Sequence, residues 1–245
     1  MSRLVEYIKK GRGKEISEYE AKVLIHQNCS KSLKAWKKDG YYIQRNTIKL
    51  KRHYYVNPAK SAEPRISANT KNYYTIIMDN SPLWKQYPKR SKSLICLSGN
   101  AQRMFHMFPY DNTKIGVCPY RDIWTSWQNL FVRLSVLNNE LWRMFVDTNV
   151  VFNVTMKTIK EFKNACKQFD KLYEENGLEY TPNWFNENYN GDLWKTLIKL
   201  LSPKTDNFRL INAGNKIPNL REVWFSGECI MVRDISSLIG ILKNE

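Results

Sequence analysis

Five residues placed beside apolar stretches have side chains that could bind an anion, hydrogen-bond a ribose or a carboxylate, or act as a carboxylate in catalysis: Arg45, Ser91, Ser93, Ser98 and Glu222. The guanidinium of an arginine can grip a phosphate through two parallel hydrogen bonds. The serines flank the apolar stretch 94–97, and a serine hydroxyl can hydrogen-bond a ribose. The glutamate opens the stretch 222–225, and a carboxylate there could stabilise a developing cation.

Each of these residues also has an ordinary explanation. Arg45 is one of 39 basic residues and could simply be a solvated surface charge. The serines lie near Pro88 and could belong to turns. Glu222 could be a surface carboxylate paired with Arg221 or Lys216. Taken singly, the residues leave both interpretations open.

Most standard catalytic signatures are missing from the sequence. It has no phosphate-binding glycine loop, no G-x-G-x-x-G and no G-x-S-x-G. The three histidines and five cysteines have no spacing typical of a metal site, so we expect no bound metal. We expect the cysteines to be buried, reduced thiols, as in a cytoplasmic protein.

Three segments in order resemble the Arg–Ser–Glu pattern of mono-ADP-ribosyltransferases, and stretches within 64–119 resemble a virus- or phage-encoded branch of that family. The segments are 42–46 (Tyr-Ile-Gln-Arg-Asn), 93–95 (Ser-Leu-Ile) before Ala101, and 220–224 (Leu-Arg-Glu-Val-Trp). The family's glycine after the arginine is Asn46 here, only the first serine of its Ser-Thr-Ser is kept, and its upstream Glu or Gln is Leu220.

The resemblance implies an NAD-dependent transferase that moves ADP-ribose to a macromolecular acceptor, protein or nucleic acid, and releases nicotinamide. It implies that Arg45 grips the NAD phosphate, that Ser93, with Ser91 and Ser98 as rivals, supports the ribose, and that Glu222 stabilises the oxocarbenium-like transition state. It also implies an α+β fold with a split β-sheet core.

The charge balance offers an alternative without catalysis. The 39 Lys and Arg against 23 Asp and Glu give a formal net charge of +16, which favours anionic partners. The 10 Phe, 8 Trp and 14 Tyr could stack on bases, with Tyr54 and Tyr55 beside basic residues in 49–53 as the best patch. A nucleic-acid-binding protein, or a viral structural or interaction protein, therefore stays open.

The order of predicted elements is helix, strands, helices, strands, which indicates α+β rather than alternating βαβ units. We expect one domain over 1–245, with a helical lead-in at 1–40 and a helical insertion at 122–201. Ser17 and Glu20 form a capping box at the start of a single helix ending near Gly40. No apolar run approaches the ~20 residues that a membrane span needs, so we expect no membrane contact.

Overall fold

Nine strands form one antiparallel sheet in the part of the chain that the computed structural model describes, residues 13–39, 43–45, 53–60, 72–99, 105–133, 156–177 and 183–233. The strand order is β1-β3-β9-β5-β2-β4-β8-β6-β7. The strands are β1 (Gly13–Ile16), β2 (Ile43–Arg45), β3 (His53–Val56), β4 (Leu94–Ser98), β5 (Phe105–Pro109), β6 (Lys114–Val117), β7 (Arg209–Asn212), β8 (Glu222–Phe225) and β9 (Cys229–Val232).

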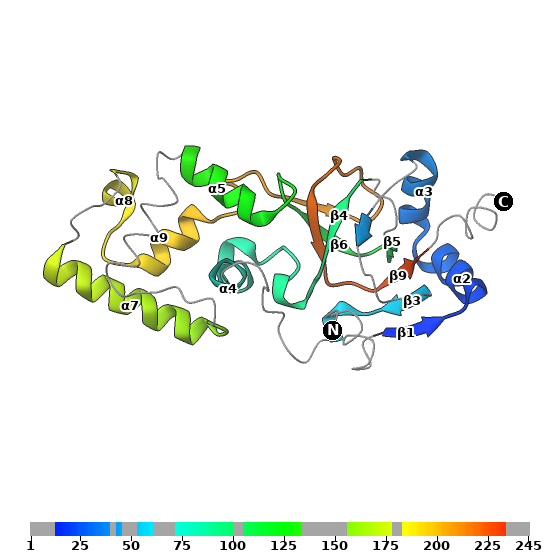
Figure 1. Cartoon of the computed structure of the whole chain (residues 1–245), viewed down its shortest axis with the longest axis horizontal. Helices are drawn as coiled ribbons and strands as arrows, with labels where there is room; N and C mark the ends of the chain where they lie inside the picture. Colours follow the sequence, from blue (N-terminus) through cyan, green and yellow to red (C-terminus); the bar gives the residue numbers. More distant parts are fainter. Residues whose placement is uncertain are drawn as a thin grey trace. The chain divides into compact units, whose positions relative to one another are not determined.

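Seven helices lie in the same described ranges, so the chain is mixed α and β as the sequence predicts (Figure 1). They are α2 (Glu18–Asn28), α3 (Ser30–Asp39), α4 (Tyr73–Asn80), α5 (Ile123–Arg133), α7 (Ile159–Asn176), α8 (Asn183–Asn188) and α9 (Leu193–Leu200). Three short 3-10 helices join them: η2 (Pro58–Lys60), η3 (Pro82–Trp84) and η4 (Arg90–Lys92). The transferase-like split core stays a prediction.

The chain divides into two compact units. The sheet unit comprises residues 1–65, 87–121 and 209–245, and the helical unit comprises 66–86 and 122–208. The first contains every strand of the sheet together with α2 and α3, and the second contains α4, α5, α7, α8 and α9. The expectation of one domain with a helical insertion stays a prediction.

Apolar clusters cover both faces of the sheet at its central strands. On one face a single apolar cluster runs from β3 to β6 and includes Met107, Val223 and Met231, all nearly inaccessible to solvent. On the other face, Phe108 and Ile230 pack with apolar residues of α2 and α3. A sheet covered on both sides holds its strand register firmly, because a one-residue slip would expose the buried set.

The N-terminal helix differs from the prediction in its continuity. The capping box is present, since the Ser17 hydroxyl accepts from the Glu20 N–H and the Glu20 carboxylate accepts from the Ser17 N–H. The predicted single helix is wrong, however, because Cys29 leaves helical geometry and separates α2 from α3. The Cys29 thiol instead donates to the Phe108 carbonyl oxygen in the sheet.

The predicted helical lead-in is also corrected by the structure, because residues 13–16 form strand β1. Every residue of β1 pairs with β3, from Gly13 opposite Val56 to Ile16 opposite His53. Only Ile16 of this strand is buried. A long-range pairing therefore decides the structure of this segment, and local sequence preference does not reveal it.

The helical unit is built around aromatic side chains. Four rings from α7 and the region of α8 pack at 4.6 to 6.0 Å between centroids: Phe169, Tyr173, Phe185 and Tyr189. The Trp84 indole N–H donates to the Leu201 carbonyl oxygen, which ties η3 to the end of α9. A second capping box, Thr158 with Glu161, begins α7. The residues 72–79 are compatible in sequence with a strand or a short helix, and the structure forms helix α4 there.

None of the helices described in the structure is long and apolar enough to cross a membrane.

All five cysteines are free and buried, which confirms the predicted buried thiols. Burial raises the pKa of the Cys29, Cys166 and Cys229 thiols above the ordinary value, so the reactive thiolate is scarce. In native protein we expect a thiol reagent to label these cysteines at least about 100-fold more slowly than in urea-unfolded protein, because reaction requires local opening. Rapid labelling of one cysteine in native protein would contradict the burial of that residue.

Candidate functional site

Glu222 lies at the first position of β8 and is buried, with 6% of its surface exposed. Its backbone N–H donates to the Tyr120 carbonyl oxygen, and its own carbonyl oxygen accepts from the Cys118 N–H. Its carboxylate accepts a hydrogen bond from the Arg90 guanidinium at 2.5 Å, and both side chains are almost fully buried. Glu222 is therefore one half of an interior ion pair, a role that the sequence alone did not suggest.

The segment that carries Arg90 covers the same part of β8. The Arg90 guanidinium lies 5.8 Å from the ring centre of Trp224, and the Tyr87 ring stacks on that indole at 6.1 Å. The Trp224 indole N–H donates to the Pro88 carbonyl oxygen. These contacts place a packed layer of side chains over the Glu222 carboxylate.

Arg45 and Glu222 leave opposite faces of the sheet. Residues paired across neighbouring strands project from the same face. Gln44 pairs with Leu97, and Leu97 pairs with Glu222, so those three share a face. Arg45 follows Gln44 directly and therefore projects from the other face, where its guanidinium donates to the Ile95 carbonyl oxygen at 2.5 Å.

Two of the predicted serines lie at the end of β4 distant from Glu222. Ser93 precedes Leu94, which pairs with Phe225 at the far end of β8, and the Ser93 hydroxyl donates to the Lys89 carbonyl oxygen. Ser91 lies within η4 and is half-buried. The register separates Ser93 from the start of β8, whereas Ser91 has no strand register and directly follows Arg90, the ion-pair partner of Glu222.

Ser98 is the predicted serine closest to Glu222 along the strands. It follows Leu97, the residue opposite Glu222. Its hydroxyl donates to the Pro218 carbonyl oxygen at 2.5 Å and accepts from the Arg221 N–H at 2.9 Å. Ser98 pairs with Ile43, however, so it projects from the same face as Arg45 and from the face opposite Glu222, and the structure gathers none of Arg45, Ser93 and Ser98 around that carboxylate. The assigned roles of all five residues stay predictions.

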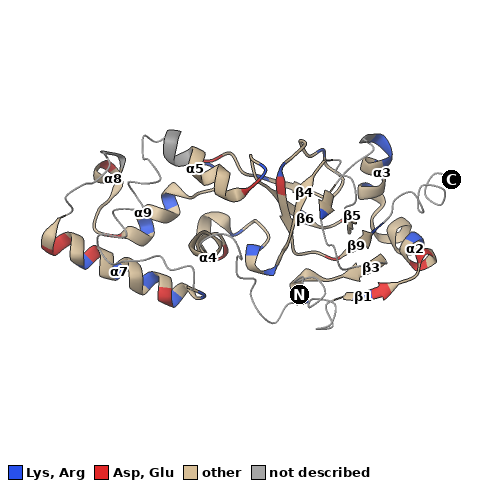
Figure 2. Ribbon diagram, viewed as in Figure 1, with Lys and Arg blue, Asp and Glu red and all other residues tan. Residues whose placement is uncertain are grey.

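The two units differ sharply in charge. The residues of the sheet unit include 27 Lys and Arg against 11 Asp and Glu, a net +16. The helical unit includes 12 of each sign and is neutral. The whole positive excess of the chain therefore belongs to one unit. Figure 2 shows basic and acidic residues alternating along α7 of the neutral unit.

Part of that excess lines a groove at one edge of the sheet. The groove has a volume of about 570 Å³, and β7 forms the last strand of the sheet order there. Its lining residues are Lys114, Arg209, Leu210, Ile211, Asn212, Asn215 and Lys216. No acidic residue is among them. Three cations and two amides thus face one open space.

The cations of this edge groove come from distant parts of the chain. Lys114 opens β6 opposite Asn212, while Arg209 lies opposite Val117 at the other end of the pairing. Lys216 follows the turn in which the Asn212 N–H donates to the Asn215 amide oxygen. All three cations are exposed, and none forms an ion pair with a described carboxylate. Sequence reasoning missed this groove because only the β6–β7 pairing assembles it.

The basic patch predicted around Tyr54 and Tyr55 is not a stacking surface. Tyr54 is 6% exposed and belongs to the core, and the Tyr55 hydroxyl donates to the Glu228 carboxylate. The basic residues 49–52 lie outside the described residues. Among the residues that the structure describes, no cluster of three or more His, Cys, Asp or Glu could hold a metal ion.

A scan against protein-family models found no match, and comparisons with curated proteins and with solved structures found no significant match either.

Proposed function

We propose that this chain binds nucleic acid through the phosphate backbone, using the surface of the sheet unit. The observation that carries the proposal is the charge division, +16 on the sheet unit and zero on the helical unit. A polyanion gains affinity for such a surface by releasing its condensed counterions. The sheet unit is therefore the binding part of the molecule.

The edge groove provides the chemistry for phosphate contacts. Arg209 can donate two parallel hydrogen bonds to a phosphate, and Lys114 and Lys216 add mobile point charges. The side-chain amides of Asn212 and Asn215 can donate to phosphate or sugar oxygens. Because no described carboxylate neutralises these cations, their charge is available to a ligand.

The aromatic side chains indicate that bases are not stacked by the described surface. Tyr19 is the one aromatic residue of the sheet unit that is exposed among the described ranges, at 75%. Trp36, Phe105 and Trp224 are in the core, and the tyrosines at 55, 87, 110 and 120 are half-buried. Recognition without stacking depends on phosphates and is insensitive to base sequence.

Binding is tested by anisotropy of a short fluorescent DNA duplex and the matching RNA strand over a salt series. We expect tight binding at about 50 mM salt that weakens steeply towards 200 mM. The triple variant K114A/R209A/K216A removes three possible phosphate contacts. For the duplex, we expect the slope of log K against log salt to become shallower by about 2 to 3.

The matched control removes the same charge from the neutral unit. The triple variant K85A/K160A/K204A replaces three exposed lysines of the helical unit. We expect it to bind like the unchanged chain. An equal loss in both triples would show that the edge groove is not the contact surface, and no binding at low salt would reject the proposed function.

NAD-dependent transfer of ADP-ribose is the second candidate. It is supported by the sequence resemblance alone, since Ser98 and Glu222 lie at neighbouring strand ends but project from opposite faces of the sheet. The reaction would break the bond between nicotinamide and ribose and join the ribose carbon to an acceptor. Incubation with labelled NAD and cell extract tests it. Nicotinamide release that is lost in a folded Glu222→Gln variant would support transfer, and absence of release would reject it.

A further inference from the structure

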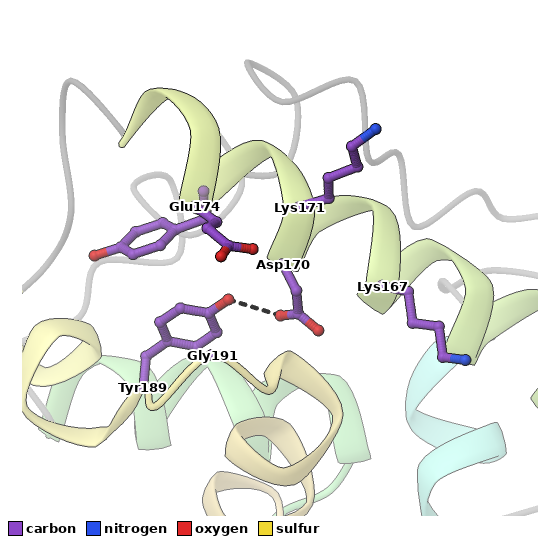
Figure 3. Close-up of a pocket in the computed structure, with 7 residues that line it drawn as sticks. Lys167, Asp170, Lys171, Glu174, Tyr189 and Gly191 are labelled. Atoms are coloured by element: carbon purple, nitrogen blue, oxygen red, sulfur yellow. Dashed lines mark hydrogen bonds between the residues drawn. The ribbon is translucent and has the colours of Figure 1, made fainter.

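A second pocket lies entirely within the helical unit. It has a volume of about 650 Å³ and lies between α7 and the segment that follows α8 (Figure 3). Its lining residues are Lys167, Asp170, Lys171, Tyr173, Glu174, Tyr189 and Gly191. We call it the tyrosine pocket. The edge groove has no part in it, so nothing below depends on nucleic-acid binding.

Asp170 presents a fixed carboxylate to the tyrosine pocket. Its Oδ1 atom accepts from the Tyr189 hydroxyl at 2.7 Å and from the Leu193 N–H at 2.8 Å. Both donors use the same oxygen, and Oδ2 is left available. Figure 3 shows the carboxyl group of Glu174 directed to the same side of α7 as that of Asp170. Two acidic groups therefore line the pocket one helical turn apart.

The neighbouring lysines form no ion pair with these two carboxylates in the part of the chain that the structure describes. Lys171 pairs with Glu175 at 3.6 Å, and its side chain points away from Asp170 in Figure 3. Lys195 pairs with Asp192 at 3.0 Å. Neither Asp170 nor Glu174 forms an ion pair with a described residue. The lining carries two lysines and two carboxylates, and with Lys171 paired to Glu175 the remaining lysine is Lys167.

Aromatic rings complete the wall. The rings of Tyr173 and Tyr189 meet edge to face, with centroids 4.7 Å apart and planes inclined by 70°. The Phe185 ring stacks on Tyr189 at 4.6 Å and supports it from the core. Ring faces attract cations through their quadrupole, and carboxylates add direct charge. Rings beside carboxylates are the surroundings in which proteins bind ammonium and guanidinium groups.

We propose that the tyrosine pocket binds an organic cation, with Asp170 and Glu174 holding its ammonium or guanidinium group and Tyr173 and Tyr189 packing against its carbon chain. A hard metal ion is a poorer ligand for it, because calcium and magnesium need six or more oxygen atoms around them. Burial raises the pKa of the Asp170 carboxyl, and a bound cation would stabilise its charged form. The cation is either a small free amine or the side chain of a peptide.

The test uses N-acetyl-arginine methylamide as probe and N-acetyl-citrulline methylamide as its neutral isostere, with binding followed by protein-observed NMR. We expect saturable binding of the arginine compound and at least about 10-fold weaker binding of the citrulline compound. A blocked Ala-Arg-Ala peptide distinguishes the sources. Tighter binding of the peptide assigns a protein side chain, and equal binding assigns a free cation. Equal affinity for the arginine compound and the citrulline compound would overturn the proposal.

Variants locate the site. The Glu174 side chain is exposed and makes no hydrogen bond or ion pair with a described residue, so we expect the Glu174→Gln variant to fold normally. We expect its affinity for the arginine compound to be about 3-fold or more lower. Asp170→Asn should reduce it about 10-fold or more. Glu187→Gln, an exposed glutamate of α8 outside the pocket, is the matched control and should leave it unchanged. Unchanged affinity in Glu174→Gln and Asp170→Asn alike would overturn the proposal.

Discussion

Replacing Glu222 with alanine is expected to lower the free energy of unfolding by about 3 to 5 kcal/mol. The change leaves the Arg90 guanidinium, whose side chain is 3% exposed, without its acidic partner in the interior. A buried charge without a counter-ion costs more than the lost hydrogen bond itself. Urea unfolding followed by circular dichroism measures the loss.

Two further variants separate this cause from a general defect. The double variant Arg90→Met with Glu222→Leu removes both charges, and we expect it to recover much of the lost stability. Lys92→Ala changes an exposed residue of the same short helix and should stay within about 0.5 kcal/mol of the unchanged chain. Full stability of Glu222→Ala would mean that the ion pair is not buried in solution.

The same variant bears on the transferase hypothesis. Loss of NAD turnover in Glu222→Ala has two explanations, a missing catalytic carboxylate or a damaged sheet. Glu222→Gln keeps an oxygen that can accept a hydrogen bond from Arg90, so it is the better test of whether the carboxylate takes part in the reaction. If this variant stays folded and loses turnover about 100-fold, the carboxylate acts on the reaction. Unchanged turnover removes Glu222 from any mechanism.

Replacing Gly116 with alanine is the second change with a large expected effect. Gly116 lies opposite Trp224 in the β6–β8 pairing, and an added Cβ would come within 2.3 Å of the indole ring. The indole is fully buried and held by Pro88 and Tyr87, so it has no room to retreat. We expect a loss of about 1 to 3 kcal/mol or more in urea unfolding, with a changed near-ultraviolet spectrum from the tryptophan.

A double-mutant cycle checks the cause. Trp224→Leu shortens the side chain that the new methyl group would meet, so the combined variant should lose less than the sum of the two single losses. We expect a coupling energy of about 1 kcal/mol or more. Additive losses would show that Gly116→Ala lowers stability through the backbone conformation at residue 116 and not through contact between the added methyl group and the Trp224 ring.

Sequence patterns predicted the elements whose structure depends on residues that are close together in the chain. The Ser17 and Glu20 capping box, the strand at 114–117 and the strand pair at 222–232 are all present. Strands β5 and β7 were missed. β5 begins at Phe105, where a short helix was predicted over 101–105, and residues 101–104 lie outside the described ranges. The residues at the two ends of β7 are polar, so its sequence alone does not indicate a strand. The segment forms a strand because it pairs with β6.

The candidate site was harder to predict for a reason of geometry. The sequence places Arg45 and Glu222 at strand ends, but side chains alternate between the two faces of a sheet. Which face each one takes depends on register across β2, β4 and β8, and a single step reverses the outcome. The helices predicted at 134–145 and after Asp234 lie outside the described residues.

Strand β7 is the last strand in the described sheet order, and its free edge bears on association between copies of the chain. A strand at the border of a sheet offers unpaired backbone groups that invite a strand from another copy. Arg209 on β7 and Lys114 on its neighbour place like charges along this border, and two copies approaching through it would repel each other. The residues proposed to contact phosphates would thereby also oppose strand pairing between two copies through this edge.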